Sequence, residues 1–160
     1  MTVKPITTIG RIEEVELVDF GNQHIVAKVD TGADVSSIWA SGVVEEDNTL
    51  SFVLFDHNSP LYTGRVIRVK KPDYRSMIIA NSFGGRERRY VVKLRIRLRG
   101  RLIKAQFSLA NRASKPYPVL LGRKLLHKKF LVDVSKSLPL DNGTKTKEQG
   151  QRLALQASEG

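Results

Sequence analysis

The chain has 160 residues, which is enough to bury the core of one domain. It contains no cysteine, so disulfide bonds, thiolate metal sites and a cysteine nucleophile are all excluded. Its formal net charge is +11, from 27 Lys and Arg residues against 16 Asp and Glu residues. Such an excess predicts attraction to polyanions, either nucleic acids or acidic peptides.

Neither a signal peptide nor a membrane segment is expected, because the chain opens on MTVKPITTIG and nowhere has about 18 consecutive apolar residues. We therefore expect a cytoplasmic protein. From Ser135 onward most residues are small or polar and bury too little surface to offset the entropy of ordering. We expect one folded domain over residues 1–134 and a flexible polar tail over residues 135–160, with a transient helical turn at Glu148–Leu155.

Alternating apolar and polar residues predict β-strands in the first half of the chain. Two of them, Glu14–Leu17 and Ile25–Val29, flank a Gly21-Asn22 pair that is typical of a hairpin turn. Two more short strands are expected over residues 50–54 and 66–69, with loop residues between them.

The clearest alternation runs from Arg89 to Arg99, where four apolar residues face one way and four basic residues the other. It predicts a half-buried strand that turns at Gly100 and returns over Ile103–Leu109. The basic residues of its outer face are Lys93, Arg95, Arg97 and Arg99.

The last predicted elements are an apolar strand over Pro118–Leu121, a short helix over Lys124–Phe130 and a strand over Leu131–Val134. With the earlier strands they predict an all-β fold, a closed and mostly antiparallel barrel with one short C-terminal helix.

A candidate for the chemistry follows directly on the strand that ends at Val29, where the chain reads Asp30-Thr31-Gly32-Ala33. An aspartic peptidase needs a carboxylate at a sharp turn, a glycine that lets the backbone approach it, and a small hydroxyl residue that braces the turn. The tripeptide alone does not settle the matter, because an Asp-Gly turn between two strands is also ordinary.

The apolar strand that ends in Gly122-Arg123 and enters a short helix is a second signal. This segment, Tyr117–Leu126, and the run Asp30–Asp34 resemble the retropepsin family of aspartic peptidases. The likeness is greatest to a bacterial branch often labelled ATP-dependent zinc proteases, some of which accompany RimK-type ATP-grasp glutamate ligases acting on a ribosomal protein. The resemblance covers residues 9–134.

The resemblance implies a retropepsin-like acid-peptidase barrel in which Asp30 is catalytic. It implies a flap, a hairpin over Met77–Tyr90 that closes on the substrate, and an ion pair between Asp34 and Arg123. The residues expected to support the catalytic turn are Thr31, Gly32, Ala33, Asp34, Gly122 and Arg123. Those expected to contact substrate from the flap are Asn81, Ser82, Phe83, Gly84 and Gly85.

A single Asp-Thr-Gly per chain implies that two chains must pair as a homodimer. Two Asp30 carboxylates about 3 Å apart cannot both ionise, so one keeps a proton while the other activates water. The predicted activity is that of an endopeptidase without a cofactor.

The residues themselves do not support the zinc label or ATP hydrolysis. His24, His57 and His127 are scattered along the chain, and neither a His-Glu-x-x-His motif nor a phosphate-binding loop is present. We therefore expect no metal site.

Two interpretations of the charge remain open. The chain could be a non-catalytic basic β-domain that binds RNA or an acidic protein through its basic strand face, although few aromatic residues alternate with the basic ones, which disfavours base stacking. Alternatively, the charge serves the peptidase by attracting acidic or glutamate-rich peptides.

Overall fold

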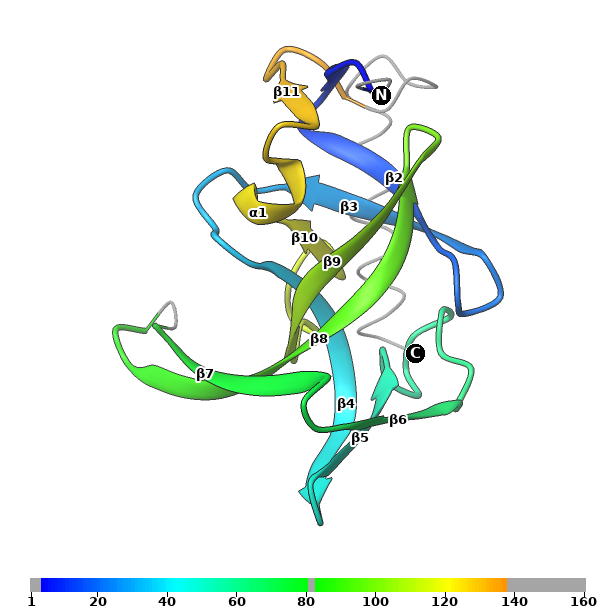
Figure 1. Cartoon of the computed structure of the whole chain (residues 1–160), viewed down its shortest axis with the longest axis vertical. Coiled ribbons are helices and arrows are strands. Elements are labelled where there is room, and N and C mark those ends of the chain that lie inside the picture. Colours follow the sequence, from blue (N-terminus) through cyan, green and yellow to red (C-terminus); the bar gives the residue numbers. More distant parts are fainter. Residues whose placement is uncertain (1–3, 81–82, 138–160) are drawn as a thin grey trace.

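The structure, a computed structural model, describes residues 4–80 and 83–137 (Figure 1). None of the described segments forms a helix long and apolar enough to cross a membrane. The elements in chain order are β1 (Thr7–Ile9), β2 (Ile12–Leu17), β3 (Gln23–Val29), β4 (Ser36–Glu46), β5 (Thr49–Leu54), β6 (Val66–Lys70), β7 (Tyr74–Ala80), β8 (Arg86–Leu98), β9 (Arg101–Ala110), β10 (Val119–Leu121), α1 (Arg123–Leu126) and β11 (Phe130–Val132).

Six strands form a closed barrel in the order β10-β3-β2-β8-β9-β4, and the pairing of β4 with β10 closes the ring. Neighbours are antiparallel except for β10 with β3 and β4 with β9, which are parallel. Strands β5 and β6 continue the sheet beyond β4, β7 pairs with β8, and β1 pairs with β11 in a separate two-stranded sheet. The predicted all-β barrel with one short helix is therefore confirmed.

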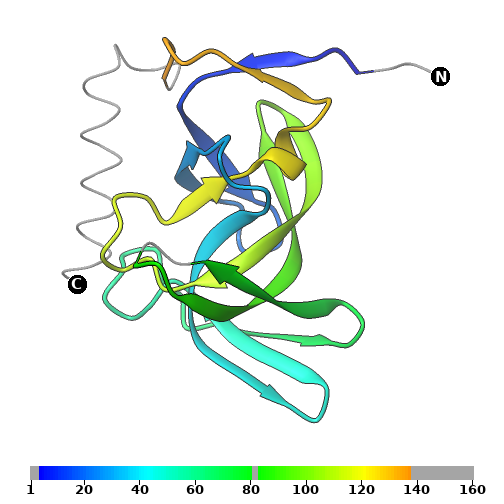
Figure 2. The ribbon, with the colours of Figure 1, turned by 90° about the vertical axis from the view of Figure 1, so that its left-hand side faces the viewer.

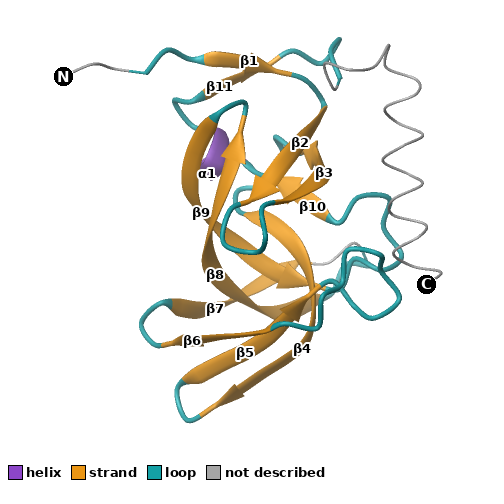
Figure 3. Ribbon diagram, turned by 90° about the vertical axis from the view of Figure 1, so that its right-hand side faces the viewer, coloured by secondary structure: helices purple, strands orange, loops and turns teal. Residues whose placement is uncertain are grey.

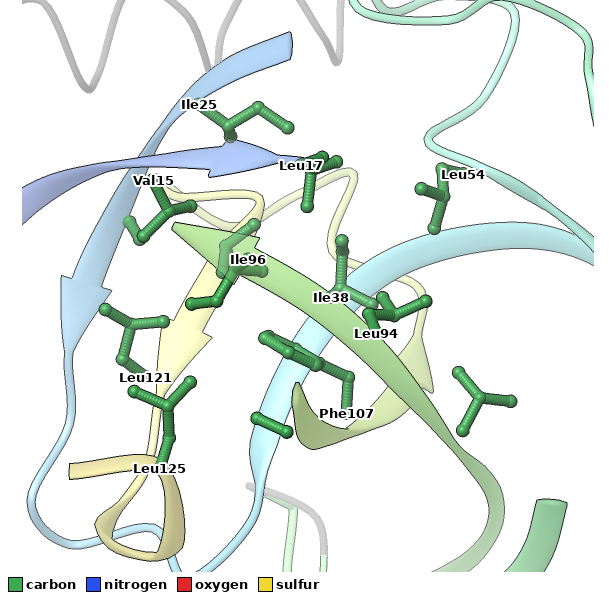
Figure 4. Close-up of a cluster of buried hydrophobic side chains, with 14 of the residues drawn as sticks. Val15, Leu17, Ile25, Ile38, Leu54, Leu94, Ile96, Phe107, Leu121 and Leu125 are labelled. Atoms are coloured by element: carbon green, nitrogen blue, oxygen red, sulfur yellow. The ribbon is translucent and has the colours of Figure 1, made fainter. Parts of the chain in front are cut away.

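The barrel interior is filled by the inward-facing side chains of its strands (Figure 4). Burying each large aliphatic or aromatic side chain contributes about 1.5–3 kcal/mol before the entropy of ordering is set against it. The side chains that are at most 1% exposed include Val15, Leu17, Ile25, Ile38, Ile96, Leu98, Phe107 and Leu121.

Both predicted hairpins are present. Strands β2 and β3 pair from Ile12 with Lys28 to Leu17 with Gln23, and Gly21 and Asn22 adopt the positive φ angles that a tight turn requires. Strands β8 and β9 pair from Val91 with Ser108 to Leu98 with Arg101, across a turn at Arg99-Gly100.

Other predictions need correction. The helix is not Lys124–Phe130 but Arg123–Leu126, because Lys128 takes a φ of 61°, which ends the helical path, and Phe130 already belongs to β11. Strand β4 was not predicted, since its first five residues are all buried and show no alternation.

The folded chain continues past Val134. The backbone N–H of Arg11 donates to the carbonyl oxygen of Lys136 (2.8 Å), and a Cβ on Gly10 would lie 2.5 Å from that oxygen. The rest of the predicted tail, with the helical turn at Glu148–Leu155, lies outside the described residues.

The predicted basic face of β8 is largely neutralised by acids on β2 and the loop after it. Arg95 pairs with Asp19, Arg97 with Glu16 (3.8 Å) and Arg99 with Glu13 (2.7 Å). Only Lys93 of the four has no ion-pair partner among the described residues. Despite the high net charge of the chain, the outer face of β8 is therefore not a row of unpaired cations.

The Glu13–Arg99 pair differs from the others because its carboxylate is buried. The Glu13 residue is 1% exposed and also accepts the backbone N–H of Gly10 (3.1 Å). We expect Glu13→Gln to lower the free energy of unfolding by about 1–3 kcal/mol, since it leaves a partly buried guanidinium without its counter-charge. Glu16→Gln, the matched change on the same strand, is expected to cost at most about 1 kcal/mol. Denaturant unfolding measures both, and equal losses would contradict this assignment.

Candidate active site

The turn that follows β3 presents the Asp30 carboxylate at the surface of the barrel. The backbone N–H of Gly32 donates to Oδ1 of Asp30 (3.0 Å), which orients the carboxylate, and the N–H of Ala33 donates to the Asp30 carbonyl (3.2 Å). Asp30 is half-buried, whereas Thr31 and Gly32 are exposed. The site thus has a fixed carboxylate beside two residues that are open to a partner or substrate.

Strand β10 and helix α1 hold this turn through backbone hydrogen bonds. Asp30 N donates to the Leu121 carbonyl (2.9 Å) and Arg123 N to the Ala33 carbonyl (2.8 Å). Gly122 N donates to Oγ of the buried Ser36 (2.9 Å), at the start of β4. Residues about 90 positions apart in sequence therefore fix both sides of the Asp30 turn.

The Arg123 side chain adds a further link to the turn. Its Nη1 donates to the Thr31 carbonyl (3.0 Å), and its Nη2 lies 3.8 Å from Oδ1 of Asp34, in the ion pair that the sequence predicts. Lys124 shares the same carboxylate (3.5 Å). Because these side chains are more than half exposed, the charges contribute little, and the bond to Thr31 is the more specific restraint.

Strands β7 and β8 form the hairpin in which the sequence predicts a flap. They pair from Tyr74 with Val92 to Ala80 with Arg86. The hairpin and the turn after β3 reach the same side of the molecule, on the left in Figure 1 and facing the viewer in Figure 2. Near its tip Phe83 is 94% exposed and Gly84 has a φ of 80°, while Asn81 and Ser82 lie outside the described residues.

A carboxylate of β4 anchors the base of this hairpin, which sequence reasoning did not find. Oε2 of Glu45 accepts the Tyr74 hydroxyl (2.6 Å) and Oε1 accepts the Tyr90 hydroxyl (3.4 Å). The hydrogen bond from Tyr74 holds the pKa of Glu45 below its usual value. Burial and the same contact raise the pKa of Tyr74 to about 12. The hairpin is thus attached firmly at its base.

Arg112 is a second residue near the site that no sequence argument assigned. It follows β9, is half-buried, and donates from Nε to the Tyr117 carbonyl (2.8 Å). Burial lowers its pKa to about 10; the charge of Arg89 acts in the same direction and that of Asp30 in the opposite one. Its guanidinium is therefore within electrostatic reach of the Asp30 carboxylate. The only sequence signal was Asn111-Arg112 as part of the resemblance.

The structure brings the seven predicted residues of the turn and its support into one site. Phe83, Gly84 and Gly85 lie on the neighbouring hairpin. Across the described residues, no three His, Asp or Glu side chains gather closely enough to hold a metal ion. The residues brought together are Asp30, Thr31, Gly32, Ala33, Asp34, Gly122 and Arg123.

Comparison with known proteins gives a family match over most of the chain. The model of the RimB-like family, described as retropepsin-like aspartic endopeptidase RimB, matches residues 8–139. Among solved structures, the crystal structure of a Legionella pneumophila protein of unknown function is similar with a TM-score of 0.65 and 23% sequence identity. That likeness covers 84% of this chain and 98% of the other, and at such identity it shows the fold alone.

Curated relatives carry a different name. A Shewanella pealeana protein named "Probable alpha-L-glutamate ligase" is 33% identical over 167 residues, which cover 94% of this chain and 36% of the relative. A Desulfotalea psychrophila protein of the same name is 31% identical over 129 residues, covering 78% and 27%. The chain thus spans about a third of the length of the curated relatives that it matches.

Gly122 is required where α1 approaches the turn that carries Asp30. A Cβ there would lie 2.9 Å from the Ala33 carbonyl oxygen and 2.9 Å from the Val35 carbonyl carbon, both backbone atoms that cannot move aside cheaply. We expect Gly122→Ala to lower the free energy of unfolding by about 1–3 kcal/mol and to displace the turn.

The matched control is Gly32→Ala, whose Cβ would meet only Oδ1 of Asp30, at 3.3 Å. It is expected to change stability by less than about 1 kcal/mol. Denaturant unfolding of both variants checks the difference, and a Gly122→Ala protein as stable as the wild type would show that the close approach is not needed.

Proposed function

The chain belongs to the RimB-like family of retropepsin-like aspartic endopeptidases, and from this premise we propose that it hydrolyses peptide bonds with Asp30 as its catalytic carboxylate. The observation that carries the proposal is the turn Asp30-Thr31-Gly32, in which the Gly32 N–H orients the carboxylate. Two backbone hydrogen bonds, from Asp30 N–H to the Leu121 carbonyl and from Arg123 N–H to the Ala33 carbonyl, support it by holding the turn in place. Such preorganisation is what a reacting carboxylate needs.

In the proposed mechanism two Asp30 side chains, one from each subunit, share one proton. The ionised carboxylate takes a proton from a water molecule as the water oxygen bonds to the carbonyl carbon of the peptide. The protonated partner gives its proton to the carbonyl oxygen. In the collapse of the tetrahedral intermediate, the carboxyl that took the proton from water gives it to the amide nitrogen, and a hydroxyl group of the intermediate returns its proton to the other carboxylate. The C–N bond breaks, the amine leaves, and the dyad again holds one proton.

The two-stranded sheet of β1 and β11 supports the proposed homodimer. It lies at one end of the barrel, at the top of Figure 3, and its outer edges have no strand neighbours among the described residues. Apolar side chains around it are exposed, with Ile6 at 55%, Leu131 at 61% and Val134 at 72%. A second copy related by a two-fold axis would cover these side chains and pair the open strand edges.

Acidic or glutamate-rich peptides are the proposed substrates. The net charge of +11 favours them by electrostatic attraction, and the curated relatives are named as ligases of glutamate. On the hairpin, Arg86 and Arg88 are exposed and have no ion-pair partner among the described residues. The RNA-binding alternative is not favoured. It depends on the four basic residues of the β8 face, and three of these form ion pairs with acidic side chains of the same chain.

Mixing wild-type and Asp30→Asn chains tests the shared dyad. Asp30→Asn alone is expected to lower kcat by at least about 10³-fold, since the amide can neither accept the proton of water nor share one. When equal amounts exchange subunits at constant total protein, about one quarter of the dimers keep both carboxylates, so activity should fall to about one quarter. A fall to one half would place the whole active site in one chain.

The substrates for this assay are a glutamate-rich peptide and its glutamine counterpart. The acidic peptide should be cleaved faster, with an advantage that shrinks as salt is added. Asp47→Asn, in the exposed turn between β4 and β5, removes a carboxylate far along the chain from the site and should leave the rates unchanged.

Placing a charge on the proposed dimer surface tests the assembly separately. Leu131→Glu, on β11, should give a folded monomer without peptidase activity, because a buried unpaired carboxylate opposes association. Leu102→Glu, at a 46% exposed position on β9, is the matched control and should remain dimeric and active. Analytical ultracentrifugation and the peptide assay measure the outcome, and an active Leu131→Glu dimer would assign the interface elsewhere.

A further inference from the structure

Arg112 is a half-buried cation with no acidic partner among residues 4–80 and 83–137. No Asp or Glu oxygen in the described part of the chain lies within the 4.0 Å of an ion pair, although Arg95, Arg97, Arg99 and Arg123 all have one. Within the same residues, Nε is the only guanidinium nitrogen with a hydrogen-bond acceptor, the Tyr117 carbonyl. Nη1 and Nη2 therefore have no acceptor among the described residues and are open to a ligand.

An unpaired and partly buried charge is costly, and proteins keep such groups chiefly where they act on a ligand. Burial is the main cause of the lowered pKa of Arg112, because it disfavours the charged form of the guanidinium. The bond from Nε to the backbone before β10 fixes the plane of the guanidinium, so the remaining donors are already oriented. Arg112 has the features of a preformed anion site.

The position of Arg112 identifies which anion it would meet. The charges of Asp30 and of Arg89 both act on it, the first from the proposed catalytic turn and the second from the β8 arm of the hairpin. Arg89 is itself paired with Glu87, so it adds positive potential without being free to bind. Arg112 therefore lies where the charges of both the proposed catalytic turn and the hairpin reach it.

We propose that Arg112 is a specificity-determining residue that binds a carboxylate of the peptide substrate next to the scissile bond, through Nη1 and Nη2. This inference rests on the proposed function only in taking Asp30 as the place where the peptide binds. A guanidinium binds a carboxylate with two parallel hydrogen bonds, which neither an amide nor a lysine side chain can reproduce. The carboxylate belongs either to a Glu or Asp side chain or to the end of the substrate chain.

The experiment compares wild type with Arg112→Gln on three matched peptides. One carries Glu around the cleaved bond, the second carries Gln in its place, and the third is the Glu peptide with an amidated C-terminus. For Arg112→Gln we expect kcat/KM on the Glu peptide to fall about 10²-fold, while the rate on the Gln peptide changes less than about 3-fold. If wild type and Arg112→Gln have equal kcat/KM on the amidated peptide but not on the Gln peptide, the bound carboxylate is the C-terminus of the substrate.

Two further variants separate recognition from structure and from net charge. Arg112→Lys keeps the charge but loses the paired hydrogen bonds, so its kcat/KM on the Glu peptide should lie between those of the wild type and Arg112→Gln. If Arg112→Gln does not fold, Arg112→Lys replaces it in the comparison. Lys115→Gln removes an exposed cation from the same loop and should leave the ratio between Glu and Gln peptides unchanged. Equal losses in Arg112→Gln on all three peptides, the amidated one included, would overturn the proposal.

A binding measurement distinguishes failure of this inference from failure of the proposed function. In full-length Asp30→Asn protein, a fluorescent Glu peptide should bind at least about tenfold more weakly once Arg112→Gln is added, as followed by anisotropy. That result supports the carboxylate site even if the wild type cuts no peptide. If the wild type cleaves the peptide but Asp30→Asn/Arg112→Gln binds it as tightly as Asp30→Asn does, the proposed role of Arg112 is wrong and the proposed peptidase activity is unaffected.

Discussion

The geometry of the site depends on one short strand, β10, which lies between β3 and β4 and pairs with both. It is parallel to β3 and antiparallel to β4, so it closes the barrel and spans the base of the loop that carries Asp30. Its last residue accepts the Asp30 N–H, and the residues after it bond to Ala33 and Asp34. A shift of β10 would move both sides of the turn, so the stability of the barrel and the position of the carboxylate are coupled.

Local pattern predicted those strands that have one face in the core and the other in solvent. Strand β8 shows this from Val91 to Leu98, and the β2–β3 hairpin was found from alternation and its Gly21-Asn22 turn. Strand β4 gave no such signal, because Ser36–Ala40 is buried throughout and pairs with β9 and β10. The β1–β11 pairing joins Thr7 to Phe130, a contact that no local window contains.

The same distinction separates the site residues that the sequence predicts from those that it misses. The Asp30 turn and the Gly122-Arg123 segment are local motifs, and the structure joins them through Ala33 and Thr31. Glu45 acts through hydrogen bonds from Tyr74 and Tyr90, which lie 29 and 45 positions away, so no local motif marks it. Arg112 is affected by the charges of Asp30 and Arg89, and no local motif marks its role either. The net charge likewise does not show which cations are free, because that depends on acids of other strands, as the Glu13–Arg99 pair shows.

Two-fold symmetry gives the carboxylate site a consequence that one chain alone would not have. A peptide that crosses the axis of the proposed dimer meets Arg112 on one side of the scissile bond and the partner subunit's Arg112 on the other. Because neither guanidinium has a counter-charge among the described residues, each would be stabilised by a substrate carboxylate. A single acidic residue would satisfy one of them and leave the other unpaired. A run of acidic residues is therefore the substrate that engages both halves of the dimer.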